Sequence, residues 1–118
     1  MKFIFLETPA FTRYQNKYMD TSEYEALRIA LVDNPERGDV ISNTGGFRKF
    51  QWLNYQWRTS QHGGLRIIYY YLETEQTKEQ FIFLITLYDN KESADFTTEQ
   101  KKKMKQAITN EKFFRRME

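Results

Sequence analysis

The sequence predicts an α+β domain in which a mainly antiparallel β-sheet is combined with two N-terminal helices and one C-terminal helix. Three observations lead to this class. Two helical segments with capping signals lie within residues 8–35, strand-like runs recur between residues 40 and 88, and a third capped segment begins near residue 97. Because the chain has 118 residues, we expect a single domain over residues 1–118, with the helices packed on one side of the sheet.

The N-terminus is expected to form a strand and then a helix. Residues 2–7 (KFIFLE) are an aromatic and β-branched run of strand length. Thr8 is suited to cap a helix, and Pro9 after it is tolerated at the first helical position. This helix should extend to about Tyr18.

A second helix is predicted immediately afterwards. Ser22 and Glu25 have the spacing of a capping box, and Asn34-Pro35 is a helix stop. Between these signals runs one apolar stripe, formed by Tyr24, Leu27, Ala30 and Leu31.

The remaining chain is expected to contribute four strands and one helix. The strand-like runs are Val40-Ile41, residues 46–53, residues 65–72 and residues 81–88. The last two are apolar on both faces, so they should be central, and an antiparallel pairing between them places Arg66 near Tyr88. A helix capped by Thr97 or Thr98 should follow, with Met104 on its inner side.

Alternation within residues 46–53 places two neighbouring basic residues on opposite faces of the strand. Arg48 and Phe50 should lie on one face, and Lys49 and Gln51 on the other. Arg48 and Lys49 therefore cannot both face one groove unless the strand bends or bulges there.

Composition excludes several function classes. The chain has no Cys and a single His, which removes thiolate nucleophiles and multi-His metal sites, and we expect neither a metal nor a cofactor. Phosphate-loop, dinucleotide, zinc-protease and nucleophile-elbow motifs are missing from the sequence. The apolar runs are shorter than the roughly 18 residues that a membrane span requires, so we expect a cytoplasmic protein without a membrane partner.

The net charge of +2 is distributed unevenly. Residues 1–39 carry 7 acids and 5 bases, residues 40–72 carry 4 bases and no acid, and residues 73–118 carry 9 of each. Eight aromatic residues lie in the acid-free middle region. Cations neutralise phosphates and aromatic rings stack on bases, so this mixture suits single-stranded nucleic acid, although most such rings on strands are core residues.

Three motifs cover nearly the whole chain. They are Asn34-Pro35-x-x-Gly38-Asp39-Val40-Ile41-x-x-Thr44-Gly45-Gly46-x-Arg48-Lys49, Gly63-Gly64-x-Arg66-Ile67-Ile68-Tyr69-Tyr70, and Tyr88-x-x-x-Glu92-x-x-Asp95-Phe96-Thr97-x-x-Gln100. In their order and spacing they resemble the HigB branch of the RelE toxin superfamily.

The resemblance implies a RelE-like fold of the microbial-RNase type and the toxin of a type II toxin–antitoxin module. Such toxins are ribosome-dependent mRNA endoribonucleases, or mRNA interferases, that inhibit translation and arrest growth. It further implies metal-free transesterification by the RNA 2′-OH, a HigA-like helix-turn-helix antitoxin as partner, and contact with operator DNA only through the antitoxin complex.

The resemblance also implies site residues. Arg66 is expected to clamp the phosphorane, Lys49 with Arg48 matches the Arg-Lys of the preceding strand, and Lys91 in the turn after the last strand is expected to assist the leaving group. Tyr88 and His62 complete the catalytic candidates, and the RNA-binding candidates are Arg58, Lys101, Lys102 and Lys105. Taken without the resemblance, a base on a sheet edge, a loop histidine or a lysine-rich helix is usually a solvated surface feature.

Departures from the family pattern leave two alternatives open. Gln51 stands where the family often has another Arg, and Asp89-Asn90 occupies the turn where relatives typically have a small residue and then Lys. One alternative is a weakened or inactive relative that keeps antitoxin or RNA binding only. The other is a plain RNA- or protein-binding module that cuts nothing.

Overall fold

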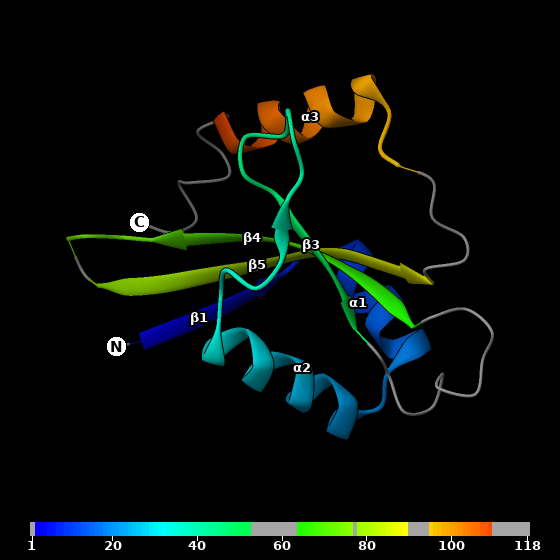
Figure 1. The fold of residues 1–118 in the computed structure, drawn as a ribbon. Helices are drawn as coiled ribbons and strands as arrows, with labels where there is room; N and C mark the ends of the chain where they lie inside the picture. The colour runs from blue at the N-terminus through cyan, green and yellow to red at the C-terminus, as the bar shows by residue number, and fades with distance from the viewer. Residues whose placement is uncertain (1, 53–63, 77, 90–94, 110–118) are drawn as a thin grey trace.

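The structure is a computed structural model that describes residues 2–52, 64–76, 78–89 and 95–109, and the structural statements below concern these residues (Figure 1). The order of the elements is the one that the sequence predicts, with five strands and three helices. They are β1 (Lys2–Glu7), α1 (Pro9–Tyr18), α2 (Thr21–Asp33), β2 (Asp39–Val40), β3 (Arg48–Trp52), β4 (Leu65–Glu73), β5 (Glu79–Asp89) and α3 (Thr98–Thr109).

The five strands form one mixed sheet in the order β1-β5-β4-β3-β2. The two apolar strands β4 and β5 are central, as predicted, and three of the four pairings are antiparallel. Strand β1 pairs in parallel with β5 at the edge. Arg66 is the Cα partner of Tyr88, which confirms the expected proximity of these two residues.

The helix caps agree with the sequence at α1 and α3 but differ at α2. The Thr8 hydroxyl accepts a hydrogen bond from the Phe11 N–H and so caps α1. The predicted cap of α2 at Ser22 is wrong, because the cap lies two residues earlier, where the Asp20 carboxylate accepts from the Glu23 N–H at 2.8 Å. Aspartate caps helices as well as serine does, so the helix begins directly after Asp20, which comes before Ser22 in the chain.

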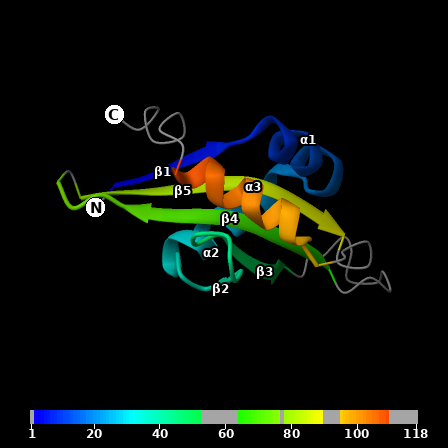
Figure 2. The same ribbon diagram turned by 90° about the horizontal axis from the view of Figure 1, so that it is seen from above.

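The helices cover both faces of the sheet, and the expectation that they share one side is wrong. Helices α1 and α2 lie beneath the sheet in Figure 1, whereas α3 lies above it and, in Figure 2, over β4 and β5. The reason lies in β4, where Ile67 and Ile68 are adjacent and both fully buried. Successive side chains of a strand point to opposite faces, so each face needs a cover.

The two faces carry separate apolar clusters. On the α1/α2 face, eleven buried residues from both helices and the central strands form the main core. On the α3 face, Ile41, Phe47 and Ile68 form a small cluster, against which Phe96 and Met104 pack. The second cluster is therefore the smaller of the two, and the polar residues of the α3 face lie beside it.

Candidate functional site

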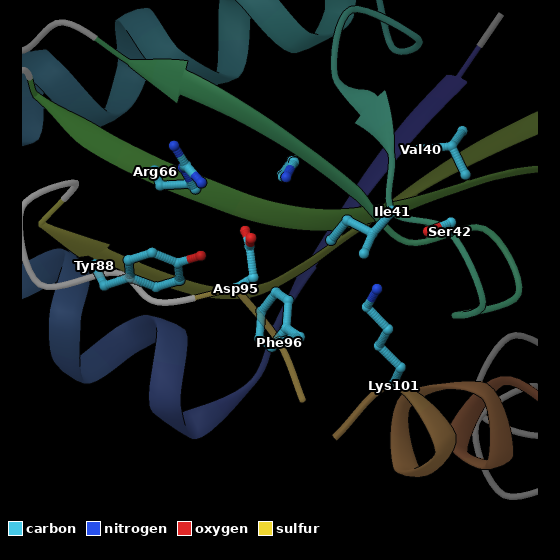
Figure 3. A pocket seen from close by; sticks show the side chains of 9 residues that line it. Val40, Ile41, Ser42, Arg66, Tyr88, Asp95, Phe96 and Lys101 are labelled. Atoms are coloured by element: carbon cyan, nitrogen blue, oxygen red, sulfur yellow. The ribbon is translucent and has the colours of Figure 1, made fainter. Parts of the chain in front are cut away.

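A cavity of about 260 Å³ opens on the α3 face, between the sheet and the start of α3 (Figure 3). Its lining residues come from β2 and the turn after it, from β3, β4 and β5, and from the chain entering α3: Val40, Ile41, Ser42, Lys49, Arg66, Tyr88, Asp95, Phe96 and Lys101.

Arg66 and Tyr88 form the centre of this cavity. They are directly opposite each other on β4 and β5, and the Arg66 guanidinium donates a hydrogen bond to the Tyr88 hydroxyl. Burial raises the pKa of Tyr88 above its ordinary value, the positive charge and hydrogen bond of Arg66 act in the opposite direction, and the Asp95 charge raises it further. The phenol is therefore neutral at physiological pH.

A β-bulge turns Tyr88 towards this cavity. The β4–β5 register shifts between Ile68 and Tyr69, so that Ile85 on β5 has no partner on β4. Strict alternation from Leu84, a residue of the main core, would direct Tyr88 to the α1/α2 face. The extra residue reverses the alternation and brings Tyr88 onto the face of Arg66.

Lys49 and Arg48 point to opposite faces of β3, as alternation predicts. Lys49 lines the cavity. Arg48 instead donates hydrogen bonds to the backbone oxygens of Gly38 at 2.7 Å and Glu36 at 3.1 Å, and its guanidinium lies 3.9 Å from the Glu36 carboxylate. Arg48 therefore holds the segment between α2 and β2 rather than facing the cavity.

The turn after β2 forms a rigid wall of the cavity. The buried Thr44 hydroxyl donates to the Ile41 carbonyl oxygen at 2.6 Å and accepts from the Phe47 N–H at 3.2 Å. Asn43 and Gly45 have φ values of 64° and 82°, the left-handed conformation found in tight turns. Ser42, exposed in this turn, lies at the cavity rim.

The chain entering α3 supplies the opposite wall. A capping box fixes it: Gln100 Oε1 accepts from the Thr97 N–H at 2.8 Å, and Thr97 Oγ1 accepts from the Gln100 N–H at 3.1 Å. Phe96 packs edge-on against Tyr88, with ring centroids 6.5 Å apart. Figure 3 shows the Asp95 carboxylate directed into the cavity beside Tyr88, and the Lys101 ammonium reaching in from α3.

The cavity is predominantly cationic. Lys49, Arg66 and Lys101 face one described carboxylate, that of Asp95. The ion pairs within 4.0 Å among the described residues are Arg28–Glu25 and Arg48–Glu36, and both lie elsewhere. No described carboxylate therefore neutralises a cavity cation at that range, and the cavity is suited to an anionic group.

The structure brings together four of the residues that the sequence singled out, namely Arg66, Lys49, Tyr88 and Lys101. Arg48 is on the other face of β3, and Lys102 and Lys105 are exposed on α3 outside the cavity lining. The candidates His62, Arg58 and Lys91 lie outside the described residues.

Asp95, Phe96 and Ser42 line the cavity but were not predicted as site residues. A signal for Asp95 and Phe96 is present in the sequence, since both come directly before the Thr97 cap of a helix that must pack on the sheet. Ser42 had no comparable signal. Its position depends on the turn that joins β2 to β3.

Within the described ranges, no three His, Asp or Glu side chains gather in a way that would hold a metal ion. None of the described helices is both long and apolar enough to cross a membrane.

Comparison of the sequence with models of known protein families finds no match.

Proposed function

We propose that this protein is a HigB-type toxin that cuts mRNA on the ribosome by metal-free transesterification. The observation that carries the proposal is the meeting of Lys49, Arg66 and Tyr88, from three adjacent strands, in one cationic cavity. The family motifs of the sequence contribute these three residues, and the chemistry requires them close together.

The proposed reaction needs only an RNA strand. The 2′-OH oxygen attacks the adjacent phosphorus, and the bond between phosphorus and the 5′-oxygen breaks. The proton of the 2′-OH passes to a base, and the departing 5′-oxygen takes up a proton. The products are a 2′,3′-cyclic phosphate and a 5′-OH, and negative charge develops on the phosphorane oxygens in between.

Arg66 and Lys49 are suited to that developing charge. The planar guanidinium offers two parallel N–H donors to phosphate oxygens, whereas the lysine ammonium provides a point charge. Arg66 is half-buried at the centre of the sheet, so its position is fixed by the strands on either side. Fixed cations stabilise a transition state without reorganisation during the reaction.

Tyr88 and Asp95 provide candidates for the proton transfers. The raised pKa of Tyr88 keeps its hydroxyl protonated at neutral pH, so it is available as a donor to the 5′-oxygen. Asp95 is the carboxylate directed into the cavity, and we assign it the acceptance of the 2′-OH proton.

Partners follow from the same proposal. The substrate is mRNA in the ribosome, which places the protein in the cytoplasm, and the neutralising partner is a helix-turn-helix antitoxin. We assign contact with ribosomal RNA to Lys102 and Lys105, which are exposed on α3 and do not line the cavity.

The test is induced expression in a bacterial host with mapping of mRNA 5′ ends during translation. The wild type should create new 5′ ends within codons and arrest growth, and coexpression of the neighbouring helix-turn-helix gene should relieve the arrest. Arg66→Ala should lower cleavage about 100-fold or more, the scale of losing one transition-state donor.

Arg13→Ala is the matched control, because Arg13 is exposed on α1 on the opposite side of the sheet. It should cut like the wild type. Thermal unfolding of purified Arg66→Ala and Arg66→Lys separates loss of the clamp from loss of fold. Cleavage that persists in a folded Arg66→Ala variant would contradict the assigned clamp.

The second candidate is a binding-only relative. It is favoured by Gln51, which lies directly opposite Arg66 on β3, at the position where the family often carries another Arg. If the wild type leaves mRNA intact but still forms a complex with the helix-turn-helix protein, this candidate replaces the first.

A further inference from the structure

One lysine of α3 differs from the other lysines of that helix. Lys101 is half-buried and lines the cavity, whereas Lys102, Lys103 and Lys105 are exposed and do not line it. Figure 3 shows the Lys101 side chain extended from α3 with its ammonium directed into the cavity, towards the side formed by Ile41 and Ser42. A solvated helix face does not account for this orientation.

The packing of α3 explains why Lys101 is the one that points inwards. Met104 packs against the cluster of Ile41, Phe47 and Ile68, and Phe96 packs there from before the helix. Residues three apart lie on one side of a helix, so Lys101 shares the inner side with Met104. The Lys101 N–H donates to the Thr97 carbonyl oxygen at 2.9 Å, which ties this residue into the capped first turn.

The charge arrangement on the strands leaves room for a third cation. Lys49 and Gln51 lie on the cavity side of β3, and Gln51 is opposite Arg66. The strand therefore contributes a neutral amide beside the guanidinium. Lys101, which reaches in from α3, adds a third positive charge to those of Lys49 and Arg66, in a cavity whose described lining holds one carboxylate.

We propose that Lys101 binds the scissile phosphate together with Lys49 and Arg66, and is therefore a catalytic residue rather than part of an outer RNA-binding face. The inference rests on the proposed function for the identity of the ligand, a phosphodiester of single-stranded RNA. The phosphate lies between sheet and helix, so α3 forms one side of the reaction site.

The experiment compares Lys101→Ala with Lys103→Ala. Lys103 lies on the same helix, carries the same charge and is exposed, so the two variants change net charge and helix propensity equally. Binding of a 2′-O-methyl RNA oligonucleotide, which cannot undergo the transesterification, is measured by fluorescence anisotropy over a range of salt concentrations. Cleavage of mRNA is measured separately on translating ribosomes.

We expect Lys101→Ala to weaken oligonucleotide binding about tenfold or more, because one charge-assisted hydrogen bond to phosphate is lost. The dependence of log affinity on log salt should become shallower by about 0.7 for that one phosphate contact. Lys103→Ala should bind like the wild type, and Lys101→Arg should restore most of the affinity.

Failure of this inference is distinguishable from failure of the proposed function. If Lys101→Ala and Lys103→Ala have equal affinity, salt slope and cleavage, Lys101 belongs to the outer face and the inference is overturned, even if the wild type cuts mRNA. If the wild type cuts nothing but Lys101→Ala alone loses oligonucleotide binding, the phosphate site stands and the nuclease proposal falls. Thermal unfolding of both variants verifies that each is folded.

Discussion

The two faces of the sheet are built from alternate residues of the same strands, yet they have different properties. The α1/α2 face buries eleven residues in one cluster, and two helices cover it. The α3 face carries a buried cluster of three residues, one helix and a cationic cavity. The first face therefore supplies most of the stability, while the second can carry charged groups because it is not required to be a continuous core.

Adjacent residues of β4 provide the sharpest test of this difference. Ile67 belongs to the α1/α2 cluster and Ile68 to the α3 cluster, and both are fully buried. Truncation to alanine should cost about 2–5 kcal/mol in each case, with Ile67→Ala near the upper end because its surroundings are packed on all sides. Urea unfolding measures both free energies. An Ile68→Ala variant that is the less stable of the two would reverse the assignment of the main core.

The second prediction concerns the charged side of the comparison. Asp95→Asn removes the described carboxylate of the cavity while keeping its shape, so the net charge there becomes more positive. Binding of an uncleavable RNA should become tighter because repulsion of phosphate is lost. Cleavage should fall about 100-fold, the scale of removing a general base.

Asp95→Asn is informative because RNA binding should become tighter while cleavage falls. Glu99→Gln is a suitable control, since Glu99 is an exposed acid in the first turn of α3 that does not line the cavity. Unchanged cleavage in Asp95→Asn would remove Asp95 from the proton transfer and leave the base unassigned.

The third prediction uses the tyrosines of both faces. Burial raises the pKa of Tyr70 on the α3 face, and burial together with the hydrogen bond that Tyr24 donates to Glu7 raises the pKa of Tyr24 on the other face by more. The folded state therefore retains these protons when the unfolded chain, with tyrosine pKa values near 10, has lost them. Stability from both groups is complete below pH 10 and is lost as pH rises through the folded-state pKa values.

Each raised tyrosine should reduce the free energy of unfolding by at most about 1.4 kcal/mol per pH unit above pH 10. Urea unfolding from pH 8 to 11 measures this slope. Tyr24→Phe should flatten it more than Tyr70→Phe, because the Tyr24 pKa is raised by the Glu7 charge as well as by burial. Equal slopes in the two variants would argue that Glu7 adds nothing to the pKa increase that burial causes at Tyr24.

The sequence predicted the elements and their order because the physical signals are local. Apolar strands such as β4 and β5 show their central positions in composition alone, and Thr8 and Thr97 show where helices begin. The inward orientation of Lys101 was not predicted, although its spacing of three residues before the apolar Met104 is a local signal for it.

The features that sequence reasoning missed depend on distant residues. The side of the sheet that α3 covers is decided by Phe96 and Met104 packing against a cluster that includes Ile68. The direction of Tyr88 depends on the bulge at Ile85, and nothing in the alternation of β5 indicates an extra residue there. Asp95 was missed because it enters the cavity only when α3 covers that face of the sheet.

The smallest expected effect connects the two faces through Thr8. This residue caps α1 by accepting from the Phe11 N–H at 3.0 Å, and its hydroxyl donates to the carbonyl oxygen of the bulged Ile85 at 2.5 Å. Thr8→Ala removes both bonds and should destabilise the protein by about 1 kcal/mol, the usual loss for a helix cap.

Cleavage should distinguish the bulge from the cap. If the Thr8 hydroxyl holds the bulge that turns Tyr88 towards Arg66, then Thr8→Ala should also lower kcat several-fold while the KM for mRNA changes little. Thr8→Ser keeps both hydrogen bonds and should restore both properties. The Asp20→Ala variant removes the equivalent cap of α2, which contacts only the main core side, so it should lower stability by a similar amount and leave kcat unchanged. A parallel loss of kcat in Asp20→Ala would mean that global stability, and not the bulge, governs the orientation of Tyr88.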